Sequence, residues 1–485
     1  MRYLAIPCLL SAAIAAQSTA DWPQFLGAGC TARAEGASTL SFDREKDLHY
    51  RVALPPGRSS PCIRGDQIFL TGLEDKQLVM IALDRNTGEE QWRHAVPEAE
   101  HQDFMHPDAG IAMPTACAND ERVFFYLPSY GLVARTLSGE PVWEKELPEP
   151  KSAFGIGTSP ALWNDTVFLL RDGCPDGMLY ALEEATGEEV WTLPRLTFRD
   201  SHATPYIWQH GDTTELIIAS TGTVVSLRPE SGEEIWRVDG LTPLVCTTPT
   251  SSDDRLYFAG WSTSSAAGPD RVLAGMEVEM EFTQEERDDP TLIFKRFDAN
   301  GDGELVEEEI PPGRMRGAVD FFDRDKSKTV SLEEFMPLMR MPATGKNLLV
   351  SIKPGGEGNV TDTHVEWSVR RGIPYVSSPL LYQDRIYMVK AGGILSCIDA
   401  KTGKARFRKH RLSDRSEYYS TPVGVDGHVV VCSTAGTIYV LEVADEVKIV
   451  REVEFGERIF ATPAFAKGTV YVRTQDALYA FDSAD

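Results

Sequence analysis

A unit of about 45 residues that returns along the chain is the feature that most restricts its fold. Each unit has a Ser- or Thr-rich approach to a proline, two alternating apolar strands, and usually a Thr-Gly or Ser-Gly turn leading to an aromatic residue. The prolines that mark the units are Pro61, Pro114, Pro160, Pro205, Pro249, Pro379, Pro422 and Pro463. Their separations are 53, 46, 45, 44, 130, 43 and 41 residues, and removing an inserted segment of 83 residues (263–345) reduces the outlier to 47. The chain therefore contains eight units of one length.

Each unit predicts several strands, because period-two alternation is interrupted by Gly or Asp turns. Units of this length with four strands each are typical of a β-propeller, so we expect an all-β, eight-bladed propeller. The recurrent aromatic residue is expected to fill the wedge between neighbouring sheets rather than to bind a ligand. It occurs as Trp92, Trp143, Trp191, Trp236 and Trp367, and as Phe407 in the sixth unit.

The segment from Tyr50 to Pro55 predicts how the ring closes. Tyr50 precedes Pro55 by the same spacing that separates Trp92 from Pro97, so this segment has the pattern of an outermost strand without a blade of its own. We expect it to complete the eighth blade, which would remove an open sheet edge. The alternative is a loose N-terminal arm.

The first twenty residues have the pattern of a signal peptide. Arg2 is followed by an apolar stretch from Leu4 to Ala16, and small residues precede Asp21. A membrane anchor is the alternative, but the stretch is shorter than the roughly 20 residues that a spanning helix needs. We expect a mature chain from Asp21 that is exported, periplasmic or extracellular, without a transmembrane segment.

Composition narrows the function classes. The chain has 73 acidic and 48 basic residues and a net charge of −25, which disfavours nucleic acid as a partner. Seven of the eight cysteines lie after the predicted signal peptide; they are scattered, and none is part of a CxxC motif. The sequence therefore predicts neither a disulfide framework nor a zinc or haem site.

The segments Ala82-Leu83-Asp84, Thr87-Gly88 and Thr402-Gly403 resemble the repeats of the pyrroloquinoline-quinone-type (PQQ-like) propellers. The opening Asp21-Trp22-Pro23-Gln24-Phe25 is similar to the start of a secreted branch of that family. The resemblance covers nearly all of 21–262 and 346–485. It implies the fold more than an activity, because the family includes both quinoprotein alcohol dehydrogenases and an outer-membrane assembly lipoprotein.

Membership among the dehydrogenases would imply an adjacent Cys-Cys pair, a calcium ion in the central funnel and often a haem motif. The sequence has no adjacent Cys-Cys pair and no CxxCH motif. We therefore expect PQQ to be an unlikely cofactor, and no catalytic residue is assigned. His101 and His106, with two nearby aspartates, are expected to belong to a polar surface loop rather than to a metal site.

The inserted segment changes from strand alternation to helical patterning, and its first motif fits a twelve-residue EF-hand loop. Calcium prefers oxygen ligands, and this spacing wraps the chain around one point. The predicted ligands are Asp298, Asn300, Asp302, the carbonyl of Glu304, and Glu309. Gly303 occupies the sharp turn, and Val306 departs from the pattern. The alternative is an acidic surface stretch.

A second loop begins 25 residues later. Its predicted ligands are Asp323, Asp325, Ser327, the carbonyl of Thr329, Ser331 through water, and Glu334. Lys328 replaces the glycine at the turn, which strains a position that favours positive φ and predicts weaker binding. Leu305 and Val330 lie at equivalent positions and are expected to pair as a short strand between the loops.

We therefore expect a signal peptide (1–20), a propeller formed by 21–262 and 346–485, and an α-helical EF-hand pair (263–345) inserted in the fifth blade. The favoured function is an exported, calcium-binding scaffold whose partner is a protein or a carbohydrate. The alternative is a divergent quinone-dependent oxidoreductase.

Overall fold

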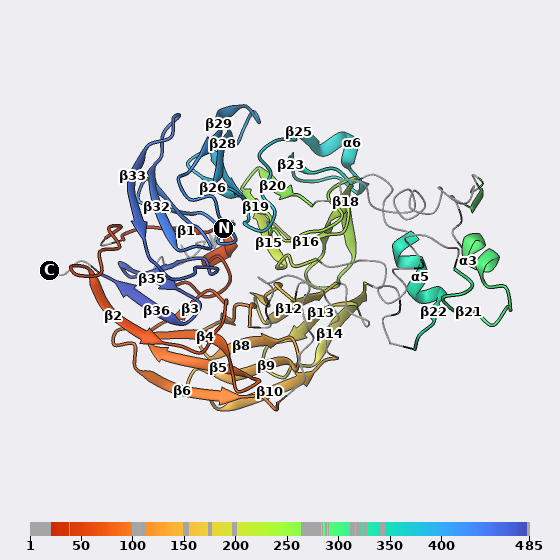
Figure 1. Cartoon of the computed structure of the whole chain (residues 1–485), viewed down its shortest axis with the longest axis horizontal. Helices are drawn as coiled ribbons and strands as arrows, with labels where there is room; N and C mark the ends of the chain where they lie inside the picture. The colour runs from red at the N-terminus through yellow and green to blue at the C-terminus, as the bar shows by residue number, and fades with distance from the viewer. Residues whose placement is uncertain are drawn as a thin grey trace, which may run out of the picture.

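The computed structural model describes residues 21–482 except 38, 99–109, 111, 149–154, 173–176, 196–200, 263–282, 284, 287–288, 290, 311–315, 317–322, 324–326 and 340–344. The predicted signal peptide lies outside these residues, as do His101 and His106. Figure 1 shows sheets arranged as a ring around a common axis, with the chain returning to its starting point. The described residues form eight four- or five-stranded sheets and one two-stranded sheet, which confirms the all-β, eight-bladed propeller.

The first four blades follow one another along the chain, each running from the axis to the rim. Blade 1 has β3 (Cys62–Arg64), β4 (Gln67–Glu74), β5 (Gln77–Asp84) and β6 (Glu90–Ala95). Blade 2 has β7 (Cys117–Ala118), β8 (Arg122–Leu127), β9 (Gly131–Thr136) and β10 (Pro141–Glu146). Blade 3 has β11 (Ala161–Trp163), β12 (Thr166–Arg171), β13 (Met178–Glu183) and β14 (Glu189–Pro194). Blade 4 has β15 (Tyr206–His210), β16 (Thr213–Ser220), β17 (Thr223–Leu227) and β18 (Glu234–Asp239), with β24 (Gly358–Asn359) added in parallel.

The last four blades complete the ring. Blade 5 has β19 (Thr250–Ser252), β20 (Arg255–Gly260), β23 (Leu348–Ile352) and β25 (Val365–Val369), and α6 (Thr361–His364) lies just before β25. Blade 6 has β26 (Leu380–Tyr382), β27 (Arg385–Lys390), β28 (Ile394–Asp399) and β29 (Ala405–Arg411). Blade 7 has β30 (Val423–Val425), β31 (His428–Cys432), β32 (Thr437–Glu442) and β33 (Ile449–Glu454), joined by β1 (Arg33–Ala34). Blade 8 has β34 (Ala464–Ala466), β35 (Thr469–Arg473) and β36 (Ala477–Phe481).

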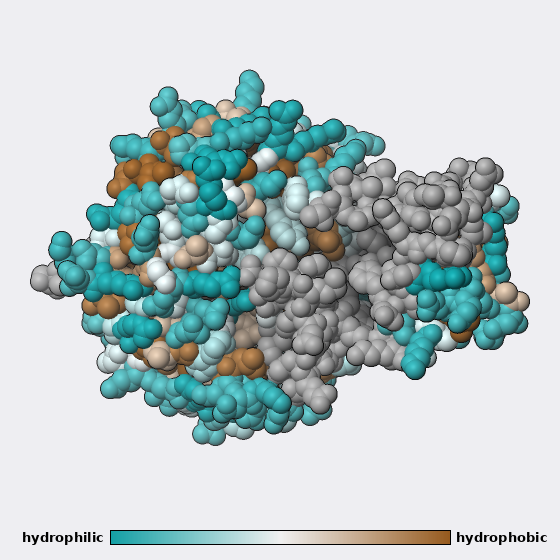
Figure 2. All heavy atoms as spheres, viewed as in Figure 1, coloured by the Kyte–Doolittle hydropathy of each residue, from teal (hydrophilic) through white to brown (hydrophobic). Residues whose placement is uncertain are grey.

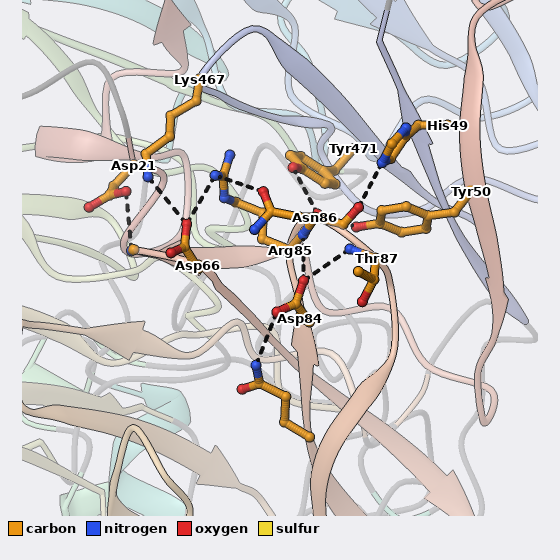
Figure 3. A network of polar contacts seen from close by, with 12 residues as sticks. Asp21, His49, Tyr50, Asp66, Asp84, Arg85, Asn86, Thr87, Lys467 and Tyr471 are labelled. Atoms are coloured by element: carbon orange, nitrogen blue, oxygen red, sulfur yellow. Dashed lines mark hydrogen bonds and ion pairs between the residues drawn. The ribbon is translucent and has the colours of Figure 1, made fainter.

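Blade 8 takes its outermost strand from the start of the chain, which confirms the predicted closure. β2 (Leu48–Ala53) pairs antiparallel with β36. Figure 3 shows how blade 8 then joins blade 1: the Tyr50 hydroxyl donates to the Arg85 carbonyl (2.8 Å), and the Arg85 guanidinium bonds the Asp66 carboxylate (3.1 Å). Lys467 of blade 8 also approaches Asp66 (3.4 Å). The two ends of the propeller are thus held by paired strands and by polar contacts.

The recurrent aromatic residues pack between blades, as predicted. Four of the six, and Tyr50 of the closing strand, lie against the turn glycine of the next blade, in the pairs Tyr50–Gly88, Trp92–Gly139, Trp143–Gly187, Trp191–Gly232 and Trp367–Gly403. A Cβ atom at these glycines would lie between 2.6 and 2.8 Å from the ring, and every one of these glycines has positive φ. The indole N–H of Trp143 also donates to the Glu184 carbonyl of the next blade (2.8 Å). Glycine is therefore required here both by the turn and by the close approach.

A closed circle of hydrogen bonds, which we call the axial belt, joins the eight blades at the axis. In each blade the N–H of one Ser or Thr donates to the hydroxyl of its counterpart in the next blade. The bonds run from Ser60 to Thr115 (2.9 Å), Thr115 to Ser159 (2.9 Å), Ser159 to Thr204 (3.2 Å), Thr204 to Thr248 (3.1 Å), Thr248 to Ser378 (3.0 Å), Ser378 to Thr421 (3.1 Å), Thr421 to Thr462 (3.0 Å) and Thr462 back to Ser60 (3.0 Å). All eight side chains are buried.

The axial belt corrects one of the repeat markers. In seven blades the belt residue directly precedes the marker proline, but in blade 2 Thr115 follows Pro114 and Ala116 takes the proline's place. The structurally equivalent position in blade 2 is therefore two residues later than the proline spacing indicates. The hydroxyl is the constant element because it carries the bond between blades, whereas the proline only restricts the backbone beside it.

The insertion leaves blade 5 between β20 and β23, and only part of it is described. That part contains α3 (Thr291–Phe297), β21 (Glu304–Leu305), β22 (Val330–Ser331) and α5 (Leu332–Met339). β21 and β22 pair antiparallel with Leu305 opposite Val330, as predicted for the segment between the loops. These short elements do not establish an EF-hand pair, which stays a prediction.

Replacing Thr204 by Val tests the axial belt. Valine keeps the shape of threonine but removes the hydroxyl that accepts the N–H of Ser159, which would leave a buried donor unsatisfied. We expect the free energy of unfolding to fall by about 1–3 kcal/mol in urea titrations. Thr213→Val, at an exposed strand position, is the control and should change stability little. Equal stability of the two variants would contradict a stabilising role for the belt.

Candidate functional site: the axial pocket

A cavity of about 170 Å³ lies on the propeller axis beside the axial belt. Its wall includes one residue from every blade, and each of these stands two positions before the belt residue of its blade. These residues are Arg58, Met113, Gly157, His202, Cys246, Val376, Tyr419 and Phe460. Because side chains alternate in extended chain, residues two apart project the same way, so the belt also fixes which side chains face the axis.

The N-terminal segment closes the opposite end of this cavity. Its contacts are with the far ends of the innermost strands: Trp22 bridges to Ile63, and the N–H groups of Gly36 and Ala37 donate to the Asp426 carboxylate. Between these contacts, the Phe25 side chain forms part of the cavity wall. The floor of the pocket therefore comes from the start of the chain.

Two cations stack on the Phe460 ring of the wall. The guanidinium carbons of Arg58 and Arg458 lie 4.2 and 4.5 Å from the centre of the Phe460 ring. The Tyr419 ring lies 6.1 Å from the same ring, and Arg58 also lines the cavity. A guanidinium held over a ring face gains electrostatic attraction from the ring while it keeps its charge.

His202 and Cys246 occupy neighbouring parts of the wall. The Nδ1 atom of His202 accepts the N–H of Gly157 (3.3 Å), so the neutral ring carries its proton on Nε2. Cys246 is partly exposed, whereas Cys30, Cys62, Cys117, Cys397 and Cys432 are buried. Burial raises the pKa of Cys397 and of Cys432 to about 12, which keeps both as unreactive thiols at neutral pH.

This arrangement suits a flat, negatively charged organic molecule. A cavity of 170 Å³ holds on the order of ten waters, which is the space of a few fused rings. Aromatic walls favour a flat apolar body, and a guanidinium favours carboxylate groups. Among the described residues, the pocket included, no three or more His, Cys, Asp or Glu side chains gather in a way that could hold a metal ion.

A second cavity, of about 350 Å³, lies between the N-terminal segment and blades 4 and 5. Arg33 lines it and donates to the carbonyls of Leu381 (2.6 Å) and Ser251 (3.4 Å). Tyr206 in the same wall shares a hydrogen bond with the Ser251 hydroxyl (2.7 Å). These contacts hold the N-terminal segment on the ring, so we take the axial cavity as the candidate site.

The first predicted calcium loop is folded around its own carboxylates. Asp298 accepts the N–H groups of Gly301 (2.8 Å) and Gly303 (3.0 Å). Glu309 reaches back to the N–H groups of Ala299 (3.1 Å) and Val306 (3.1 Å). Two of the other predicted ligands also meet in this loop, since the Asn300 amide donates to Asp302 (2.9 Å), and the last one, Glu304, lies in β21.

The second loop is described in part, and Asp325 lies outside the described residues. Asp323 accepts the N–H groups of Ser327 (3.0 Å) and Lys328 (2.8 Å), and Glu334 accepts that of Ser331 (2.9 Å). The Thr329 hydroxyl donates to Glu304 of the first loop (2.9 Å). Lys328 has a φ of 70°, the positive value expected from its place at the turn.

Sequence reasoning missed the axial pocket altogether. None of the eight residues that stand two before the belt belongs to a recognised motif, and they are spread over most of the chain. The available signal was positional, because each stands two residues before the recurrent Ser or Thr. Arg58, His202 and Phe460 are conspicuous only once those eight positions are aligned.

The fold and the pocket define a closed propeller with an axial cavity. The family model described as "Outer membrane protein assembly factor BamB" matches residues 34–172 and 175–279, half of the chain. The chain therefore belongs to this family of PQQ-type propellers.

Two curated relatives match shorter segments. A quinoprotein ethanol dehydrogenase from Pseudomonas putida is 26% identical over 236 residues, which is 44% of this chain and 36% of the relative. The outer membrane protein assembly factor BamB of Burkholderia pseudomallei is 36% identical over 120 residues, 24% of this chain and 30% of the relative. The chain thus spans about a third of the length of these relatives.

Solved structures share the fold at low identity. BamB from Moraxella catarrhalis has a TM-score of 0.51 and 12% identity, and the match covers 89% of this chain and 98% of that one. A europium-containing methanol dehydrogenase has the same TM-score and identity, with 96% and 98% covered.

These comparisons correct the cofactor prediction, which named calcium and held PQQ to be unlikely. A quinoprotein stands among the relatives, so the missing Cys-Cys pair and haem motif were poor grounds for setting the quinone aside. Calcium has no assembled centre in the part of the chain that the structure describes.

Among the described residues, no helix is both long and apolar enough to cross a membrane.

Cation binding by the first loop can be tested by calorimetric titration with calcium. We expect one stronger site, which is lost in Glu309→Gln because that change removes a charged oxygen ligand. Glu230→Gln, on the rim of blade 4, is the control and should leave the titration unchanged. The absence of any binding heat at millimolar calcium would show that the loop is only an acidic turn.

Thiol labelling tests the exposure of the pocket wall. At pH 8 we expect a thiol reagent to modify Cys246 well before Cys397 or Cys432, because burial raises the pKa of the latter two to about 12. Their thiolate forms appear only as the pH rises towards that value, so moving from pH 8 to 9 should leave them unlabelled. Peptide mass spectrometry gives the order, with Cys246→Ser as the control. Equal labelling of Cys246 and Cys397 in the folded protein would contradict the burial pattern.

Proposed function

We propose that the chain is an exported binding protein whose axial pocket takes a flat organic acid of the size of a quinone cofactor. The observation that carries this proposal is the pocket wall, where the Arg58 guanidinium and the Phe460 ring lie side by side. A carboxylate would bond the guanidinium, and a ring system would lie against the aromatic side chains.

PQQ itself fits this wall. It is a flat, carboxylated quinone, and Arg58, Tyr419 and Phe460 are the residues that would hold it. Once bound, such a quinone supplies an acceptor for two electrons and their protons. The residues of the chain would supply the carboxylate contacts, the apolar faces and, through Phe25, a closed floor that limits the entry of water.

Two features of the relatives support the wider setting. An outer membrane protein assembly factor among them supports an exported location and a role beside other proteins. A quinoprotein ethanol dehydrogenase supports the second candidate function, a quinone-dependent oxidoreductase acting on an alcohol. Both candidates use the axial pocket, and they differ in whether the bound molecule turns over.

The loops of the insertion form a separate part of the proposal. Asp298, Asp302 and Glu309 would hold a divalent cation, supported by their spacing and by the closed fold of the first loop. We expect the second loop to bind a cation more weakly than the first, because Lys328 stands where the turn favours glycine.

Titration of the purified protein with PQQ tests the pocket. We expect saturable binding that is weakened roughly 10- to 100-fold in Arg58→Gln, because a hydrogen bond to a charged group contributes about 1.5–3 kcal/mol. Arg228→Gln removes an exposed guanidinium elsewhere on the ring and should leave binding unchanged. Equal affinities in these two variants would contradict an axial site.

Dye reduction separates the two candidate functions. With PQQ and calcium present, an oxidoreductase should reduce an electron-accepting dye when supplied with a panel of alcohols and sugars. Binding without turnover supports the binding protein, whereas turnover that is lost in Arg58→Gln supports the oxidoreductase.

A further inference from the structure

The outer strand of blade 6 has a charge opposite to that of the rest of the molecule. Residues 401–415, which contain β29, have seven Lys or Arg and one Asp, a net charge of +6, whereas the remainder of the chain has −31. Six of these cations are exposed and form no ion pair with any described residue: Lys401, Lys404, Arg408, Lys409, Arg411 and Arg415. We call these six residues the basic rim.

Protection of a sheet edge does not account for this charge. β29 pairs only with β28 and is an edge strand, and edge strands often carry a lysine that discourages pairing with other chains. The outer strands of the neighbouring blades are edges too, but neither is basic: β25 has one Glu and no cation, and β33 has one Arg and two Glu. Blade 6 is therefore basic beyond what an edge requires.

A β-bulge presents two of the cations together. Phe407 pairs with Cys397, and His410 pairs with Leu395, so that Arg408 and Lys409 both stand opposite the single residue Ser396. Lys409 has a φ of 57°, which marks the irregular backbone at this point. A bulge turns the strand and re-aims its side chains, so adjacent cations can face the same surroundings rather than opposite sides of the sheet.

Exposed apolar residues lie beside the basic rim. Ile449 and Val450 begin β33, the outer strand of blade 7, with 37% and 45% of their surface exposed. Asp445, in the turn just before them, bonds Arg406 of β29 (3.3 Å) and Arg385 (2.9 Å), which fixes the two outer strands next to each other. Figure 1 shows β29 and β33 as neighbours on one side of the ring, and Figure 2 shows hydrophilic residues along this side with a hydrophobic patch close by.

We propose that the basic rim, with Ile449 and Val450, docks the propeller edge-on to a lipid surface rich in anionic phosphate headgroups. Headgroups form a broad field of negative charge that attracts cations without demanding a fixed geometry, which suits a convex rim with no cleft. Two aliphatic side chains beside the cations can enter the boundary between headgroups and acyl chains. This inference does not depend on the axial pocket being occupied.

The strong overall acidity does not prevent this docking. Charges are screened over about 8 Å at physiological ionic strength, so only the side of the ring that touches the lipid contributes strongly. The acidic remainder would instead be repelled, which orients the molecule with blades 6 and 7 towards the surface. An acidic polypeptide is the competing partner, but it would leave the exposed Ile449 and Val450 without a role.

Vesicle co-sedimentation of the full chain tests the proposal. We expect binding to vesicles of phosphatidylglycerol and phosphatidylcholine, none to phosphatidylcholine alone, and loss of binding as salt is raised. Combined Arg408→Gln, Lys409→Gln and Arg411→Gln should weaken binding roughly a hundredfold, because each cation near the surface contributes a similar amount to the free energy of binding. Lys46→Gln, Lys76→Gln and Arg228→Gln remove the same charge from other, exposed parts of the ring and should bind as the wild type does.

A further variant isolates the apolar part. Ile449→Ser with Val450→Ser should weaken binding severalfold while leaving the salt dependence in place. Circular dichroism and thermal unfolding establish that each variant is folded before it is compared. The proposal is overturned if the two triple variants lose vesicle binding equally, or if the protein binds both kinds of vesicle equally. It is also overturned if the protein binds polyglutamate but not the vesicles.

Discussion

The axial belt is the interaction on which the rest of the propeller depends. Each Ser or Thr in it accepts from one neighbouring blade and, through its own backbone N–H, donates to the other, so every blade holds two others in register. Both partners of each bond are buried, and water cannot replace a lost hydroxyl without opening the ring. Because extended chain alternates, the same residues decide that the side chain two positions earlier faces the axis. The belt that closes the fold thus also builds the wall of the candidate site.

The rim is held by a different device, in which a large ring of one blade lies on a glycine of the next. Blade 4 departs from this device: Trp236 is fully buried and donates to Glu215 of its own blade (2.9 Å). The closing blade adds a buried cation, since Arg473 donates to the carbonyls of Ser59 (3.0 Å) and Thr71 (2.5 Å). Burial lowers the pKa of Arg473 to about 9, so those carbonyls stabilise a charge that water cannot reach.

The sequence predicted those features of the fold that recur from one repeat unit to the next. The eight units, the closing strand from Tyr50 and the inter-blade tryptophans all repeat within the chain, so a single sequence contains several copies of the signal. The proline of blade 2 misled the spacing because Pro114 stands near the marker position, whereas the bond is made by Thr115. The pocket could not be predicted from motifs, because its eight wall residues share a position but no residue type. Function at the axis depends on how the eight units differ, and spacing reveals only how they agree.

The same reasoning applies to charge. An acidic composition describes the average surface, and it disfavours a general attraction to polyanions. Binding is decided within a Debye length, where Arg58 at the axis and Arg408 at the rim are the charges that a ligand would meet. A strongly acidic surface around these cations makes them more selective, because an anion that approaches any other part of the ring is repelled. Net charge and local sites therefore act together: the repulsion restricts where an anionic partner can bind, and these local cations determine that place.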